Sequence, residues 1–218
     1  MTELASTERT RIRREPQRSV KERAVLHEII DQAFFAHVGF LDKGPMVIPT
    51  LCWRVDEFIF IHGSIGSRMI KCLIDGQESC TTFTLLDGIV LARSPFYHSA
   101  NYRSAVVLGK YEQLQKESDK ELALKHFMDQ LVQSRWQELR PMTEQELNAT
   151  AVLRLPLNEA SVKMRKGGPG DPEKDINFPI WTGVYPVAYQ VSVAKASDTL
   201  VGEDVAPVLN HPLAQKAD

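Results

Sequence analysis

Short runs with the character of β-strands follow one another along this chain without regular helices between them. Parallel strands need long crossover connections, usually helical, whereas antiparallel strands need only short turns. The sequence therefore predicts a mainly β, α+β protein, with an antiparallel barrel and helices packed outside it. The expected strands cover residues 35–40, 46–55, 57–62, 79–86, 89–94, 102–113 and 151–163.

Three capping-box patterns predict where helices begin, because each places a Ser or Thr three residues before a Glu. They predict helices over about 20–33, from 118 to about 133, and after 143; a shorter helix is expected over 64–73. The three patterns are Ser19–Glu22, Ser118–Glu121 and Thr143–Glu146.

Prolines and glycines predict the irregular positions. Pro49 interrupts the run 46–55, so we expect an edge strand or a bulge there. The triplet Leu86–Gly88 predicts a hairpin turn between two strands. Residues 166–179 contain three glycines and three prolines and are expected to form a loop.

The chain divides into a basic arm, one domain and a tail. Residues 1–18 carry five arginines and predict a flexible arm. Because no aromatic residue is interleaved with them, a solvated tail is favoured over a nucleic-acid patch. Residues 19–197 form the expected single domain, and residues 198–218 are expected to be a poorly ordered or partner-wrapping tail.

Composition excludes several classes of function. The net charge of −2 gives no basic field for nucleic acid or a membrane surface. No apolar run approaches the roughly 18 residues of a membrane span, and no signal peptide is recognised, so a cytoplasmic location is expected. The three cysteines lack metal-type spacing, which predicts reduced thiols and no metal site.

Residues 58–71 have the features of a phosphate-binding turn. An apolar strand ends there, two glycines allow close backbone approach, and hydroxyls and cations open a helix. Phosphate favours free backbone N–H groups, a positive helix end and charged donors. An ordinary strand–turn–helix joint has the same pattern, and neither a P-loop nor a dinucleotide fingerprint occurs. The candidate phosphate contacts are Ser64, Ser67, Arg68 and Lys71, after a strand that ends at His62 and a close backbone approach at Gly63 and Gly66.

Two further clusters contain candidate site residues. Polar side chains open the strand after residue 98, where they either hydrogen-bond a heterocycle or solvate a hairpin end. Trp181 follows the Gly/Pro-rich loop and either stacks on a flat cofactor or anchors the core. The polar candidates are His98, Tyr102, Arg103 and Ser104.

Six segments in a fixed order resemble the pyridoxamine 5′-phosphate oxidase-like superfamily of FMN-binding split barrels. Within it, the resemblance is greatest to the branch of nitroimidazole-resistance reductases and flavin-nucleotide-binding proteins. The segments are Val47–Thr50, Ile61–Ser64 with Ser67 and Arg68, Leu85–Arg93, Ser99–Ser104 with Gly109, Ala160–Arg165 and Trp181–Pro186.

The resemblance implies a six-stranded split barrel that forms a homodimer with two FMN sites at the subunit interface. It implies that the strand with Val47, Pro49 and Thr50 lies along the isoalloxazine ring, and that the turn at 62–68 reaches the phosphate. Residues like Tyr102, Arg103, Ser104 and Trp181 come to the flavin in such proteins, often from the other subunit. His62 or His98 is the expected proton donor.

The function expected from this resemblance is that of an FMN-dependent oxidoreductase that reduces a small flat acceptor, such as a nitroaromatic. No arginine follows Arg165, so vitamin B6 oxidation is not expected. The alternatives are a flavin store or regulator without turnover, and a split barrel that binds haem or a deazaflavin.

Overall fold

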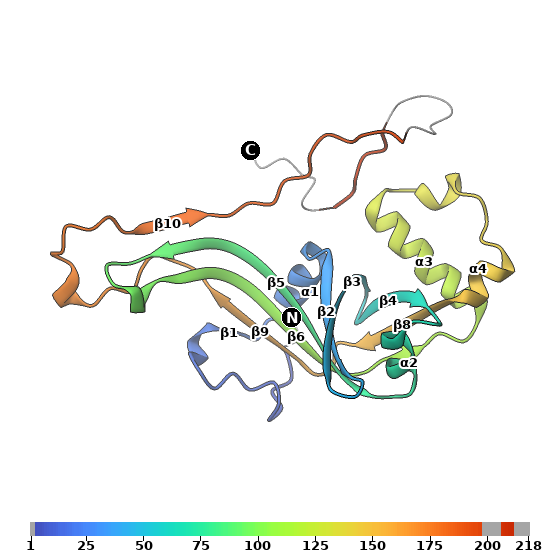
Figure 1. The fold of residues 1–218 in the computed structure, drawn as a ribbon, viewed down its shortest axis with the longest axis horizontal. Coiled ribbons are helices and arrows are strands. Elements are labelled where there is room, and N and C mark those ends of the chain that lie inside the picture. The colour runs from blue at the N-terminus through green and yellow to red at the C-terminus, as the bar shows by residue number, and fades with distance from the viewer. Residues whose placement is uncertain (1–2, 198–205, 212–218) are drawn as a thin grey trace.

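A computed structural model of the chain describes residues 3–197 and 206–211. The strands form one sheet in which every pairing is antiparallel (Figure 1). The strands are β1 (Ser19–Val20), β2 (Phe35–Leu41), β3 (Pro45–Val55), β4 (Phe58–Ser64), β5 (Glu78–Leu91), β6 (Ser99–Lys110), β7 (Glu112–Gln113), β8 (Thr150–Pro156), β9 (Ala160–Arg165) and β10 (Gly183–Pro186).

The strand order in the sheet is β1-β9-β6-β5-β2-β3-β4-β8-β7, and β10 pairs with β5 outside this path. The sheet curls but does not close on itself, which is the architecture of a split barrel. The prediction of a mainly β fold with peripheral helices is therefore confirmed.

Within the described residues, four α-helices pack around the sheet: α1 (Arg23–Gln32), α2 (Arg68–Ile74), α3 (Glu117–Leu131) and α4 (Glu144–Ala149). The larger core lies between α1, α2 and the inner face of the sheet, where Leu26, Ile70 and Phe83 are fully buried. A second core, built around Trp53, Phe60 and Phe127, lies under α3. No helix in the described ranges is long and apolar enough to span a bilayer.

Several strand boundaries differ from the prediction, which expected one strand over 102–113 where the structure has β6 and β7. The triplet Leu86–Gly88 forms no hairpin turn, because β5 continues through it to Leu91 with a register shift against β6. Such a bulge inserts an extra residue and bends the strand without ending it. The expected strand 151–163 is divided into β8 and β9 by a turn after Pro156.

The helix starts confirm only one of the three capping boxes. Thr143 accepts a hydrogen bond from the Glu146 backbone, and the Glu146 side chain accepts one from the Thr143 backbone. Ser19 instead lies in β1, and α1 begins four residues later. Ser118 lies inside α3, whose N-cap residue Lys116 makes no side-chain capping bond.

Pro49 lies at an edge, as expected. It pairs with His37 on β2, whereas the register between β3 and β4 covers only Cys52–Val55. Within the described chain, no strand pairs with the other side of β3 at Pro49. The N–H group that proline lacks therefore costs no hydrogen bond between strands on that side.

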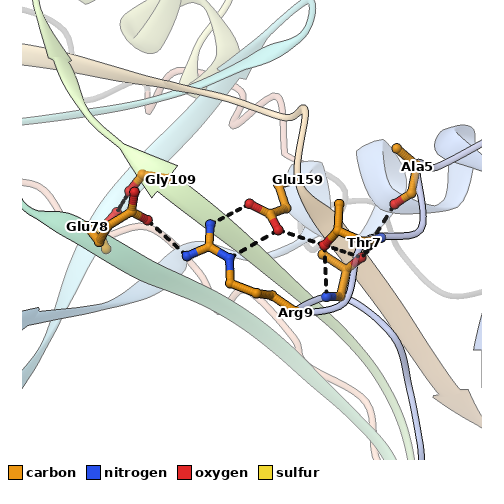
Figure 2. A network of polar contacts seen from close by, with 8 residues as sticks. Ala5, Thr7, Arg9, Glu78, Gly109 and Glu159 are labelled. Carbon is orange, nitrogen blue, oxygen red and sulfur yellow. Dashed lines mark hydrogen bonds and ion pairs between the residues drawn. The ribbon is translucent and has the colours of Figure 1, made fainter.

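The N-terminal arm lies against the sheet, although the sequence predicts a flexible one. Arg9 pairs with Glu159, in the turn between β8 and β9, and with Glu78 at the start of β5, at 3.1 Å (Figure 2). The Thr7 hydroxyl donates to the same Glu159 carboxylate at 2.6 Å, and Ser19 pairs with Lys163 in β9. The arm is thus anchored at several points along its length.

The β5–β6 hairpin reaches outward from the sheet with β10 beside it, while α3 and α4 lie at the other end of the molecule (Figure 1). The predicted loop 166–179 follows the outer end of this hairpin. Arg93 fastens it, because its side chain and backbone N–H both bond the buried Asp171 carboxylate at 2.9 Å.

Most of the predicted tail lies outside the described residues, which omit 198–205 and 212–218. The described segment 206–211 lies beside α3, where the Asn210 N–H donates to the Leu131 carbonyl at 2.6 Å. His211 at the end of this segment is 8% exposed.

Candidate functional site

The predicted phosphate turn is formed where β4 ends and α2 begins. The Ser67 N–H donates to the Ser64 carbonyl at 2.9 Å, and the Gly66 N–H donates to the Ser64 hydroxyl at 3.2 Å. Ser67 occupies the N-cap position of α2, and its side chain makes no capping bond. The turn therefore presents the Ser67 hydroxyl next to the positive end of α2.

Two cationic side chains, Arg68 and Lys71, flank this turn and differ in their contacts. Arg68 is 58% exposed and its Nε lies 3.2 Å from Oδ2 of Asp42, in the turn after β2. The Lys71 side chain is exposed, and no hydrogen bond or ion pair involves its ammonium group within the described chain. A surface ion pair is worth at most about 1 kcal/mol, so Asp42 holds Arg68 only weakly against a competing anion.

His62 lies beside this turn, but its ring belongs to an aromatic cluster. The imidazole centroid is 5.8 Å from the Trp53 ring and 5.6 Å from the Phe127 ring. Burial lowers the pKa of His62, so the ring is neutral at neutral pH. Its Nδ1 is buried without a hydrogen-bond partner among the described residues.

The strip predicted to lie along the flavin forms part of an outward-facing surface. Val47, Pro49 and Leu51 alternate outward along β3, and Val47 is 64% exposed. Thr50 lies on β3 between two of these outward-facing residues. Gly39 of β2 pairs with Val47. A Cβ at Gly39 would lie 3.2 Å from the Cys80 carbonyl, so β2 and β5 approach closely there.

The side chains of Tyr102, Arg103 and Ser104 do not share one surface, because neighbours on a strand alternate sides. Arg103 pairs with Asp87 at 2.9 Å and donates to the Gln32 side chain of α1 at 2.6 Å. The hydrogen bonds to the Asp87 carboxylate hold the pKa of Arg103 above its usual value. Ser104 donates to the Lys163 carbonyl at 3.1 Å.

Trp181 and His98 lie on the outward-reaching part of the chain. Trp181 is 62% exposed, is 5.5 Å from the Tyr185 ring and packs over Gly183. The exposed His98 has its Nδ1 2.8 Å from the Ser94 carbonyl, at the outer end of the β5–β6 hairpin. β4 lies toward the opposite end of the molecule (Figure 1), so His62 and His98 do not meet within one chain.

The structure thus brings together one group of predicted residues and separates the others. Residues 62–71 meet the β2–β3 turn through the contact between Arg68 and Asp42. Contacts with Asp87 and with Gln32 of α1 hold the Arg103 side chain. Trp181 lies away from it, on the outward-reaching part of the chain. No set of three metal-ligating side chains gathers anywhere in residues 3–197 or 206–211.

A cavity of about 220 Å³ lies where α1, β3, α3 and the segment 206–211 meet, and the sequence did not predict it. Its lining comes from segments as distant as residues 30 and 211, and no local pattern connects them. The aromatic triplet Trp53, Phe60 and His62 on paired strands was the available signal, since these residues share one face. The cavity is lined by Ile30, Asp31, Ala33, Phe34, Leu51, Cys52, Trp53, Arg54, Phe127, Gln130, Leu131, Asn210 and His211.

Known proteins resemble this chain in sequence and in structure. The family model described as pyridoxamine 5′-phosphate oxidase matches residues 22–164. The flavocytochrome Anf3 from Azotobacter vinelandii is 38% identical, with a TM-score of 0.88 over 93% of this chain and 94% of that one. The FAD and haem binding protein from Mycobacterium smegmatis is 32% identical, with a TM-score of 0.82 over 87% and 94%.

A third structure, a 5-nitroimidazole antibiotic resistance protein from Bacteroides thetaiotaomicron, shares the fold at 21% identity and a TM-score of 0.55, over 66% of this chain and 85% of that one. No curated protein matches the chain significantly. The family model covers well over half of the sequence, and the strand order is that of an open split barrel. The chain therefore belongs to the pyridoxamine 5′-phosphate oxidase-like split-barrel family.

Proposed function

We propose that this protein is a flavin-binding redox protein. The observation that carries the proposal is the full-length similarity, at 38% and 32% identity, to a flavocytochrome and to an FAD and haem binding protein. The turn between β4 and α2 adds a local argument, since its helix end, hydroxyl and two cations suit a phosphate group.

Both common flavin nucleotides fit this argument. The sequence predicts FMN, whereas one of the two relatives is named for FAD. FMN and FAD share the ribityl phosphate, so Ser67, Arg68 and Lys71 would contact the same group in either molecule. Val47 and Pro49 on β3 would face the isoalloxazine ring with apolar surface.

Haem is a second candidate cofactor, because both relatives carry a haem-associated name. His62 fits this role in chemistry: it is a neutral, half-buried imidazole whose buried Nδ1 has no partner in the described chain. A neutral imidazole nitrogen is the usual protein ligand to haem iron. His62 is thus our candidate ligand, and Trp53 and Phe127 would keep water from that position.

A homodimer is part of the proposal. The outward face of the sheet exposes Phe35, Leu41 and Val47. The outward-reaching β5–β6 hairpin and the chain beside it add exposed aromatic and aliphatic side chains. Contiguous exposed apolar surface of this kind marks an interaction site in a soluble protein. A second subunit would also bring its own Trp181 and His98, which lie at the outward-reaching hairpin, toward the strip on β3. One chain leaves this strip uncovered.

When bound, the flavin would supply the electron or hydride transfer, and the protein would orient the ring and control access to it. Arg68 and Lys71 would neutralise the phosphate, and the β3 strip would hold one side of the ring in an apolar setting. His62, being neutral at neutral pH, is able to accept a proton, and His98 is exposed to solvent. Reduction of a small flat acceptor is the reaction that this arrangement favours.

The test is the absorption spectrum of freshly purified protein, followed by mass spectrometry of the released ligand. We expect oxidised-flavin bands, with a Soret band if haem is also present, and a released mass of FMN or FAD. A protein that neither retains a flavin nor binds added FMN or FAD would refute the proposal. Reoxidation of the bound flavin by nitroaromatics under anaerobic conditions separates an enzyme from a flavin store.

A further inference from the structure

The cavity between α1, β3 and α3 has the composition of a small-molecule site. Aromatic and aliphatic side chains form most of its wall, including those of Phe34, Trp53 and Phe127. The polar rim contains Asp31 and Arg54, which pair through two contacts at 2.6 and 2.9 Å. Ligand pockets in proteins combine a mostly apolar wall with a few fixed polar groups in this way.

The protein's own chain places a stacked pair of aromatic rings at the edge of this cavity. The His211 imidazole lies flat against the Phe34 ring, with centroids 3.6 Å apart and an angle of 17° between the planes. His211 is 8% exposed, and burial lowers its pKa, so a neutral heteroaromatic ring occupies this position. Stacked aromatic rings attract each other beyond the effect of their buried area.

The size of the cavity limits the ligand. Its volume of about 220 Å³ lies below the range of about 300–1,000 Å³ that is typical of pockets for drug-sized molecules. One or two fused rings suit this volume, whereas an intact flavin or haem needs more room. Displacement of the His211 ring would add the space that this ring now takes.

We propose that this cavity binds a planar heteroaromatic molecule of one or two rings, and that His211 holds the ring position until such a molecule displaces it. Phe34 is the stacking platform, Trp53 and Phe127 form the wall, and the Asp31–Arg54 pair supplies the polar edge. The segment carrying His211 thereby competes with the ligand for one site.

The position of the cavity suggests its use, a step that rests on the proposed function. Leu51 lines the cavity and also follows Val47 and Pro49 on the outward face of β3. Residues two apart on a strand are separated by about 7 Å. A ring in the cavity would therefore lie next to the strip assigned to the flavin, where a flat electron acceptor has to bind.

Calorimetric titration of the full-length protein tests the binding site. Benzimidazole and 2-methyl-5-nitroimidazole are the planar probes, and cyclohexanol is the non-planar control. We expect both planar probes to bind and cyclohexanol not to bind. Absence of planar-probe binding at millimolar concentration, in the wild type and in His211→Ala alike, would overturn the proposal.

Three variants assign the contacts. His211→Ala should tighten benzimidazole binding about fivefold, as expected when a competing conformer populated at roughly 80% is removed. Phe34→Leu should weaken it about three- to tenfold through the lost stacking. Phe96→Leu, at a ring that is 83% exposed on the hairpin tip, is the matched control and should change nothing.

The outcomes separate this proposal from the one on function. Unchanged or weaker binding in His211→Ala would show that His211 does not compete, and unchanged binding in Phe34→Leu, with native circular dichroism, would place the probe elsewhere. These titrations do not require flavin. A flavin-free protein with the expected probe series would refute the proposed function alone, and a flavoprotein without it would refute the cavity proposal alone.

Discussion

The two arginines predicted to bind the flavin both have carboxylate partners in the structure, but the two pairs differ in strength. Arg103 makes several contacts with Asp87 and Gln32 and is only partly exposed, so these contacts are structural. Arg68 makes one exposed contact with Asp42. Both arginines were predicted flavin ligands because of their residue type. They are distinguished only by their carboxylate partners, which lie 16 positions from Arg103 and 26 positions from Arg68 in the sequence.

The first prediction concerns Arg68. Arg68→Ala should weaken flavin binding by roughly 1.5–3 kcal/mol, about ten- to a hundredfold, because a charge-assisted phosphate contact is lost. Asp42→Asn is the matched control: it removes the competing carboxylate and should leave the affinity equal or higher. Fluorescence titration of cofactor-free protein with FMN and FAD measures both. Equal affinity of Arg68→Ala and wild type would remove Arg68 from the site.

The second prediction concerns pH. The pKa of His62 is lowered in the folded state by burial, so protonation favours the unfolded state. Its contribution to stability is present above the unfolded pKa of about 6.5 and is lost as the pH falls below that value. Cofactor-free His62→Leu should therefore lose less stability than wild type between pH 7.5 and 5.5, in urea unfolding experiments. Identical losses would contradict this account.

At the scale of elements, the strand and helix order followed from the sequence, but several boundaries did not. Leu86–Gly88 resembles a turn when considered alone, and pairing with β6 on one side and β10 on the other keeps it in β5. Asp87 at this bulge accepts from Arg103, which stabilises the irregular position. Local propensity is overruled here by long-range pairing, which one sequence does not display.

The three capping-box patterns give a third prediction. Thr143→Ala should reduce the free energy of unfolding by about 0.5–2 kcal/mol, because Thr143 caps α4. Ser19→Ala and Ser118→Ala are sequence-matched controls, and both should stay within about 0.5 kcal/mol of wild type. Urea denaturation measures all three. A loss in Ser118→Ala equal to that in Thr143→Ala would show that the capping contact is not the cause.

The loop after β9 gives a fourth prediction. Arg93→Ala leaves the Asp171 carboxylate, which is 4% exposed, without its ion-pair partner, so the loop should detach from the hairpin. Limited proteolysis should then cut within residues 166–182 several times faster than in wild type. Arg135→Ala, which breaks an exposed pair within one helical turn, should leave the cutting rate unchanged.

At the scale of the whole molecule, the proposed homodimer rests on the exposed apolar face of the sheet and on the outward-reaching β5–β6 hairpin. The sequence alone placed these residues on strands, and the fold shows that they face solvent in one chain. The predicted site residues lie dispersed in one chain, and the proposed dimer would bring them together. Their assembly was expected from the family resemblance and not from any local pattern.

The fifth prediction tests this dimer. Phe35→Asp places a charge on the outward face, and a two-fold interface would bury it twice, so dimer affinity should fall at least about tenfold. Leu139→Asp, at a similarly exposed apolar side chain near α4, is the control and should leave the dimer intact. Sedimentation equilibrium measures both. A monomeric wild type, or a dimer unaffected by Phe35→Asp, would place the interface elsewhere.

The contacts of Arg9 and Thr7 with Glu159 attach the N-terminal arm to the turn before β9, and they determine which part of the protein responds last to acid. The Arg9 and Thr7 contacts lower the pKa of Glu159 to about 2, so this attachment persists in mildly acidic solution, whereas burial lowers the pKa of His62 and of His211 and makes protonation of either ring unfavourable to the folded state. A mildly acidic solution should therefore loosen the α3 side of the molecule while residues 3–20 remain fastened to β9. Hydrogen exchange at pH 5 would reveal a protein that opens from its C-terminal side and keeps its beginning in place.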